Sequence, residues 1–172
     1  MKKFIFYLAA AGWIISLVIH ILSLAKTDVE ASIPYIWILH IGIFAVWIPA
    51  IRVLRVFRAN QGGKKLFDIY RFVILNAPVW LAVLAIGSFA YCIIGSFIFL
   101  FMKEGTPGII NGQYVLHNHG KILRIITEGE YHQAKAGVMR FFSGVWLAFY
   151  GMAAAILYRK GNAETIQNGI AV

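Results

Sequence analysis

The chain of 172 residues is too apolar and too poor in charge for a soluble domain: 60% of its residues are hydrophobic and 13% are charged, whereas soluble domains carry about 25% charged residues. The net charge of +9 gathers at the ends of apolar runs, which is typical of membrane-topology signals and not of nucleic-acid binding. The single cysteine, Cys92, excludes an intramolecular disulfide. The composition therefore predicts an integral membrane protein without a nucleic-acid partner.

The first apolar run covers about residues 4–24 and follows two lysines. It ends in Ser23-Leu24-Ala25, which resembles the small-residue cleavage site of a signal peptide. Because its apolar part exceeds the about 7–15 residues of a signal-peptide core, we expect a membrane-spanning helix instead. Three further runs reach the length of about 20 residues that a bilayer requires: residues 33–56, 79–102 and 138–158.

A basic cytoplasmic loop, residues 57–78, is predicted between the second and third runs. Its part from Lys64 to Leu75 is interpreted as an interfacial helix that ends before Asn76-Ala77-Pro78. Each basic residue at a membrane surface attracts anionic lipid headgroups by about 1 kcal/mol. We therefore expect such headgroups to bind at Arg52, Arg55, Arg58, Lys64 and Lys65.

Small residues recur at every fourth position in three of the runs. This spacing places them on one helix face, where they allow two helices to approach closely in lipid. The pattern predicts helix contacts either within one chain or between copies of a homo-oligomer. The residues are Gly12 and Ser16, then Ser88, Cys92 and Ser96, then Gly144 with Ala148 and Gly151 with Ala155.

Residues 103–137 are predicted to fold outside the membrane. Asn111-Gly112 is a turn signal because both residues tolerate positive φ, and His119-Gly120 is a second candidate turn. We expect a small β-hairpin supported by the helix bundle, since a lone hairpin is marginally stable in water. The pairs expected across the second turn are Asn118 with Lys121 and Leu116 with Leu123.

The segment Thr127-Glu128-Gly129-Glu130 has the pattern of a capping box, in which two side chains and two backbone N–H groups bond reciprocally. The fourth helix should therefore begin at about Glu128, well before its apolar part. At 1.5 Å per residue, a helix from there to Tyr158 is about 45 Å long and exceeds the hydrocarbon core of a bilayer. Its first turns should stand outside the membrane beside the hairpin.

The basic residues predict the orientation of the chain. Lysine and arginine dominate both ends and the loop at 57–78, whereas acidic residues balance them in the other loops. The positive-inside rule places both ends and that loop in the cytoplasm. Residues 1–172 are thus predicted to form one all-α membrane domain: a four-transmembrane-helix bundle, N-in and C-in, with a small extracytoplasmic β-hairpin between helices three and four. The short, lysine-led start favours a bacterial cytoplasmic (inner) membrane.

All five histidines fall on the outer half of this predicted topology. His20 and His40 lie inside spans at similar depth, where ionisable residues suggest function. They are interpreted as neutral residues bonded across helices, as ligands of a b-type haem or a metal, or as sensors of pH near their ordinary pKa of about 6.5. His117, His119 and His132 are candidate metal ligands in the outer segment.

The sequence contains no P-loop, GxSxG, HExxH or CxxC motif and no carboxylate inside a span. It favours a non-enzymatic integral membrane protein that acts through protein contacts, in an immunity, accessory-subunit or regulatory role. Residues 103–137 are the expected partner surface. One alternative is a membrane redox protein that binds b-type haem or a metal through His20 and His40, and a second is an oligomeric channel or small transporter.

Overall fold

The computed structural model describes residues 2–61 and 68–158. This part of the chain is mostly helical and contains four helices that are long and apolar enough to cross a membrane, as the sequence predicts. They are α1 (Lys2–Leu24), α3 (Ile38–Gln61), α5 (Val79–Met102) and α6 (Glu128–Leu157).

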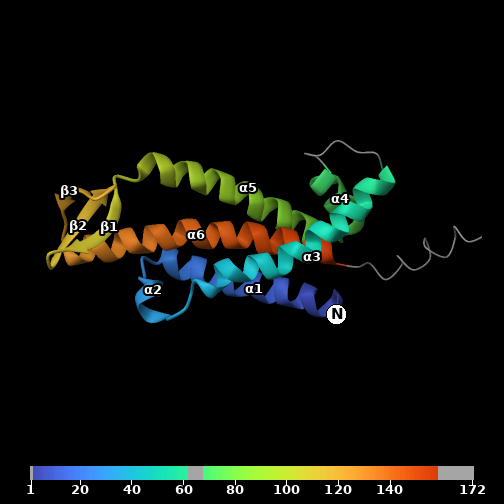
Figure 1. The fold of residues 1–172 in the computed structure, drawn as a ribbon, viewed down its shortest axis with the longest axis horizontal. Helices are drawn as coiled ribbons and strands as arrows, with labels where there is room; N and C mark the ends of the chain where they lie inside the picture. Colours follow the sequence, from blue (N-terminus) through green and yellow to red (C-terminus); the bar gives the residue numbers. More distant parts are fainter. Residues whose placement is uncertain (1, 62–67, 159–172) are drawn as a thin grey trace, which may run out of the picture.

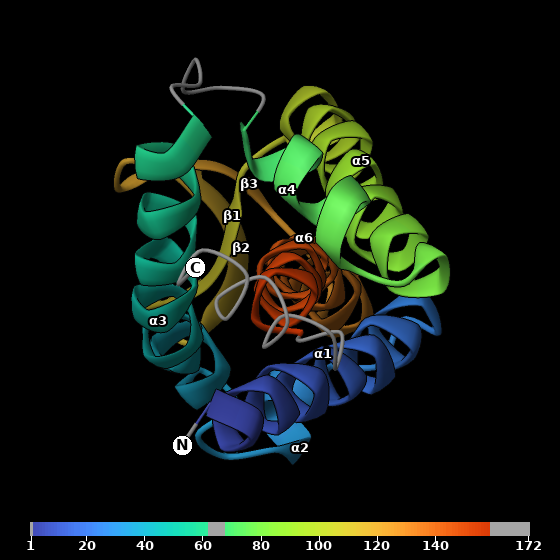
Figure 2. The ribbon, with the colours of Figure 1, turned by 90° about the vertical axis from the view of Figure 1, so that its right-hand side faces the viewer.

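Helix α6 is the central element of the bundle. It packs against α1, α3 and α5, and the view along the bundle shows these three helices arranged around it (Figure 2). Within the described residues, α1 and α5 are joined by side chains and not by close backbone packing. Trp13 Nε1 on α1 donates to Ser88 Oγ on α5 at 3.3 Å. The resulting space between α1 and α5 matters for the site described below.

Close packing of α1 and α3 against α6 centres on Tyr150. Its hydroxyl donates to the Leu39 carbonyl at 2.8 Å, and a Cβ on either Gly12 or Gly42 would overlap its side chain. The next residue of α6, Gly151, lies against the Trp13 ring. The small residues predicted at Gly12 and Gly151 therefore form contacts within one chain.

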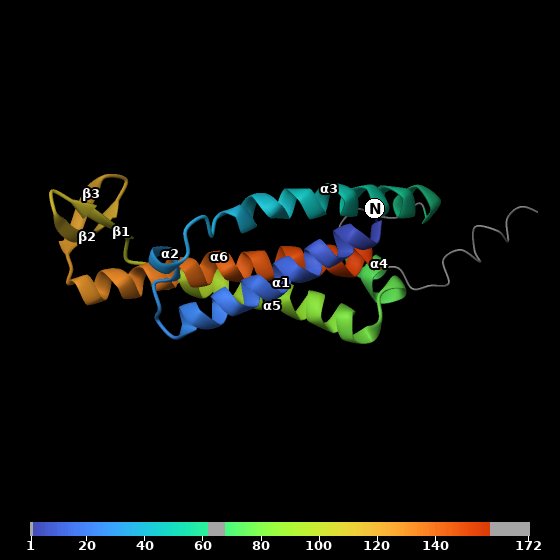
Figure 3. The ribbon, with the colours of Figure 1, turned by 90° about the horizontal axis from the view of Figure 1, so that it is seen from below.

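Two short helices lie at opposite ends of the bundle (Figure 3). Helix α2 (Val29–Ser32) precedes α3, so α3 begins at Ile38 and not at residue 33 as predicted, because the Asp28 side chain caps a separate turn there. Helix α4 (Asp68–Asn76) covers the described part of the helix predicted over Lys64–Leu75. Residues 62–67, with the predicted lipid contacts Lys64 and Lys65, lie outside the described residues.

The segment between α5 and α6 forms three antiparallel strands in the order β1-β2-β3, and not a two-stranded hairpin. The strands are β1 (Thr106–Ile110), β2 (Gln113–Asn118) and β3 (Lys121–Ile125). Both predicted turns are confirmed. Asn111 and Gly112 have φ of 50° and 77°, and His119 and Gly120 have φ of 48° and 83°, which suits two-residue hairpin turns.

The register predicted for β2 and β3 is half correct. Asn118 pairs with Lys121, but Leu116 pairs with Arg124 and not with Leu123, because an irregularity follows Leu116. A bulge inserts one unpaired residue and bends the strand. As a result Val115 and Leu116 are both buried, whereas every residue of β3 is exposed.

The sheet rests on the first turns of α6, at the end of the bundle where α1 and α5 finish (Figure 1). Those turns begin with the predicted capping box: Glu130 N donates to Thr127 Oγ1 at 3.2 Å, and Thr127 N donates to Glu130 Oε2 at 2.8 Å. Tyr114 on β2 stacks near Tyr131 on α6, with ring centroids 4.9 Å apart. The sheet is thus held on a well-capped helix end.

Candidate functional site: a groove between three helices and the sheet

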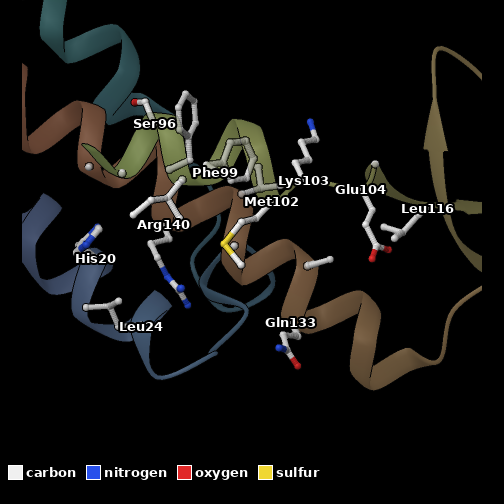
Figure 4. Close-up of a pocket in the computed structure, with 18 of the residues that line it drawn as sticks. His20, Leu24, Ser96, Phe99, Met102, Lys103, Glu104, Leu116, Gln133 and Arg140 are labelled. Atoms are coloured by element: carbon white, nitrogen blue, oxygen red, sulfur yellow. The ribbon is translucent and has the colours of Figure 1, made fainter. Parts of the chain in front are cut away.

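A groove of about 690 Å³ lies between α5 and α6 at the sheet end of the bundle, with α1 along one side (Figure 4). This volume is in the range of small-molecule sites, about 300–1,000 Å³. Two of the α5 residues that line it, Ile94 and Met102, are 59% and 77% exposed. The groove therefore opens on the flank of the bundle and not into a closed core.

The floor of the groove is a hydrogen-bonded triad from three helices. His20 on α1 is 5% exposed, and its Nδ1 lies 2.9 Å from Ser143 Oγ on α6. Its Nε2 lies 2.7 Å from the hydroxyl of Tyr91 on α5. Tyr91 lines the groove, whereas Ser143 is fully buried behind His20.

The proton positions in this triad follow from its donors and acceptors. Ser143 Oγ lies 2.8 Å from the Met139 carbonyl oxygen, to which the hydroxyl donates its one proton. Ser143 Oγ is then an acceptor, so His20 Nδ1 carries a proton and Nε2 accepts from the Tyr91 hydroxyl. In this arrangement both ring nitrogens of His20 have a hydroxyl partner, and Ser143 is fully buried.

The walls of the groove are apolar. Phe99 on α5 and Phe141 on α6 stack with ring centroids 4.7 Å apart, and Ile94 and Ile98 continue the α5 wall. Gly95 on α5 and Gly137 on α6 also line the groove, and a Cβ at either would meet no atom within 4 Å. The space beside these two glycines is therefore open.

The mouth of the groove carries charged side chains. Arg124 on β3 bonds to Glu104 Oε2 at 3.2 Å and to Glu130 Oε1 at 3.0 Å. Arg140 on α6 donates from Nη2 to the Ser23 carbonyl at 3.0 Å, and its Nε is buried without a hydrogen-bond partner. Lys103, at the end of α5, lies 5.4 Å from the Phe99 ring centroid.

The loop between α1 and α3 is fastened to the first turns of α6. His132 Nδ1 lies 2.9 Å from Asp28 Oδ2, and Lys135 forms an ion pair with Glu30. Burial would raise the pKa of Glu30, but hydrogen bonds from Lys135 and Trp37 and the charge of Lys135 outweigh it and hold that pKa below its ordinary value. These bonds fix the end of α1, and with it one side of the groove.

The predicted histidine sites are distributed over different contacts. His40 is exposed on α3, and its Nδ1 accepts from Trp146 Nε1 at 3.2 Å, so it belongs to a different contact from the triad of His20. His117 is half-buried on β2 and His119 is exposed in the turn, while His132 pairs with Asp28. Across residues 2–61 and 68–158, no group of three His, Cys, Asp or Glu side chains is placed to hold a metal ion.

Three residues in or directly behind the groove were not identified from the sequence as site residues. Tyr91 and Ser143 are partners of His20 that only the packing of three helices brings together. Arg140 falls inside the predicted span 138–158, where an arginine is itself a signal of function.

The predicted lipid contacts at the other end of the bundle differ among themselves. Arg52 and Arg55 are exposed on α3, as a headgroup contact requires. Arg58 instead approaches Asp68 of α4, with Nε 3.2 Å from Oδ2. It therefore links α3 to α4.

No protein-family model, curated protein or solved structure matches this chain.

Proposed function

We propose that the protein is a non-enzymatic binding protein of the membrane that holds an amphiphile in the groove between α5 and α6. The observation that carries the proposal is the groove itself. It combines apolar walls, a polar floor at Tyr91 and charged residues at its mouth, and it opens on the flank of helices apolar enough to span a bilayer. A molecule with an apolar chain and a polar headgroup is complementary to these apolar and charged surfaces.

The proposed orientation places the sheet outside the cytoplasm, in a bacterial inner membrane. It is supported by the basic residues of α3, among them Arg52 and Arg55, which lie at the end of the bundle opposite the sheet. Basic residues favour the cytoplasmic side of a membrane. In that orientation the groove opens into the outer leaflet.

Two glycine variants test the proposal directly. Gly95→Leu places a side chain in the groove, and Gly87→Leu adds the same side chain elsewhere on α5, where a Cβ also meets no atom within 4 Å. Native mass spectrometry of the protein extracted from membranes should find one retained lipid on the wild type and on Gly87→Leu, and none on Gly95→Leu. Equal lipid retention by both variants would refute the proposal.

A second candidate is a contact with a protein partner through the sheet. Every residue of β3 is exposed, including Ile122, Leu123 and Ile125, and β3 forms an edge of the sheet. An exposed edge strand can pair with a strand of another protein. Ile122→Lys and Ile125→Lys should abolish capture of such a partner while leaving lipid retention in the groove unchanged.

The haem alternative predicts a Soret band that sharpens on reduction of the purified protein. In the structure both ring nitrogens of His20 are already bonded to hydroxyl groups, so a haem would have to displace Ser143 or Tyr91. An absorbance spectrum, oxidised and then reduced, separates the two hypotheses. A stoichiometric haem would replace the amphiphile proposal.

A further inference from the structure

The charges at the mouth of the groove define the ligand more closely, and this inference rests on the function proposed above. Two carboxylates line the groove, Glu104 and Glu130, and both are held by Arg124. Glu130 is further engaged by Thr127 in the capping box. Among the described residues, neither carboxylate forms an ion pair with Lys103 or Arg140.

Two cations of the lining have no carboxylate partner among the described residues. Arg140 bonds only to the Ser23 carbonyl, and its Nε is buried and unpartnered. Lys103 contacts the Phe99 ring. Buried arginine groups without a partner are costly, and in Figure 4 the Arg140 side chain lies beside His20 and Leu24 of α1, within the groove region. The site therefore has an excess of positive charge next to apolar walls.

The two cations stand at the level where a headgroup would lie. Ser23, the partner of Arg140, is in the last turn of α1, and Lys103 directly follows the last residue of α5. Both positions are at helix ends, where the hydrocarbon core gives way to headgroups. The apolar wall formed by Ile94 and Ile98 extends from there along α5, where an acyl chain can lie.

We infer that the groove is selective for a phospholipid with a net negative headgroup, which is attracted by the positive charges of Arg140 and Lys103 in the lining. Guanidinium groups bind phosphate through paired N–H donors, and lysine binds it as a point charge. A zwitterionic lipid carries a cationic group that opposes the charge excess in the mouth. An anionic lipid satisfies it.

The test measures the dissociation constants of phosphatidylglycerol and phosphatidylcholine with identical acyl chains, by titration into the full chain in detergent followed by native mass spectrometry. At about 1 kcal/mol per basic residue, each cation contributes roughly fivefold to the preference for phosphatidylglycerol. Arg140→Gln and Lys103→Gln should each reduce the preference by that factor. Lys121→Gln removes an exposed charge of β3 outside the groove and should leave the preference unchanged.

The outcomes separate this inference from the proposed function. Binding of both lipids with equal affinity would overturn the anionic selectivity and leave a groove that binds amphiphiles. Binding of neither lipid would overturn both. If Arg140→Gln fails to fold, Lys103→Gln decides the question, because Lys103 is exposed at a helix end, and an undiminished preference in that variant would contradict the inference.

Discussion

Helix α5 precedes the sheet in the chain and helix α6 follows it, and both are long and apolar enough to cross a bilayer. The two helices differ strongly in how much of their surface is buried inside the protein. Within its most apolar stretch, 72% of α6 is buried inside the protein, against 6% of α5. Helix α5, which has the higher mean hydropathy, is the more exposed of the two. In lipid, apolar surface gains little from contact with another helix, so large apolar residues face the chains and small residues mediate packing.

The difference also explains where the groove forms. The backbone of α6 packs closely against three long helices and the sheet, whereas among the described elements the backbone of α5 packs closely only against α6 and α4. On the α1 side of α5, long side chains such as Trp13 and His20 reach across to Ser88 and Tyr91. Space that would be filled in a tighter bundle is left open there.

The largest difference in stability is expected between replacing a buried aromatic residue of α6 and replacing an exposed aromatic residue of α5. Trp146 is fully buried and Phe97 is 58% exposed. Trp146→Ala should lower the free energy of unfolding by about 3–5 kcal/mol, since it removes packing and leaves a cavity, while Phe97→Ala should change it by less than about 0.5 kcal/mol. Unfolding of both variants in one detergent checks this, and similar losses would remove the contrast between the helices.

The next effect concerns glycines. Gly12→Leu should destabilise the protein by about 1–3 kcal/mol, because its Cβ would overlap Tyr150 of α6. Gly87→Leu on α5 meets open space and should be neutral or slightly stabilising, since glycine weakens a helix interior. Thermal unfolding of the two variants gives the comparison, and a stable Gly12→Leu protein would contradict the packing of α1 on α6.

A smaller effect is expected where the two helices begin. Helix α6 begins with the Thr127 capping box, whereas α5 begins at Pro78 without a side-chain cap. Thr127→Ala should lower stability by about 1 kcal/mol. Hydrogen exchange should show the loss in the first turns of α6 beside the sheet. Unchanged exchange there would mean that the sheet, and not the cap, secures this helix end.

The smallest effect is a pH dependence at the Glu30–Lys135 ion pair, which fastens the 25–37 loop to α6. The pKa of Glu30 is held below its ordinary value, so the ionised carboxylate stabilises the folded state at neutral pH. That stabilisation should fade as the pH falls from the ordinary pKa of about 4.3 through the lower pKa of the folded state. It should stay below about 1 kcal/mol, as for other partly exposed pairs.

Glu30→Gln provides the control for this prediction. Its stability should lack the acid-dependent loss that the wild type shows in the same range of pH. Parallel melting curves of wild type and Glu30→Gln from pH 7 downward check this. A steeper loss in Glu30→Gln would reverse the sign that the lowered pKa requires.

Local signals predicted the elements of this fold well. Runs of about 20 apolar residues identified the four long helices, the capping pattern located the start of α6 at Glu128, and positive-φ residues located both turns. Each of these features depends on a few neighbouring residues. The added strand β1 and the bulge after Leu116 are features of the pairing between strands, which no local pattern reports.

The site was predictable only in part. The sequence singles out His20 as an ionisable residue within a predicted span, but its bonds to Tyr91 and Ser143 require that α1, α5 and α6 meet. The small residues of α6 and its hydropathy, which is lower than that of α5, are features of the sequence that indicate a central helix. The volume of the groove depends on side chains from five helices and strands and has no sequence signature.

The most direct test of an amphiphile in the groove uses the single cysteine of the chain, since Cys92 lines the groove. The rate at which a lipophilic maleimide modifies Cys92 should fall saturably as phosphatidylglycerol is added. Ile93→Cys in a Cys92→Ser background reports the neighbouring position on α5, which is 45% exposed and outside the groove lining, and its rate should not change. Equal slowing at both positions, or none at either, would contradict the account.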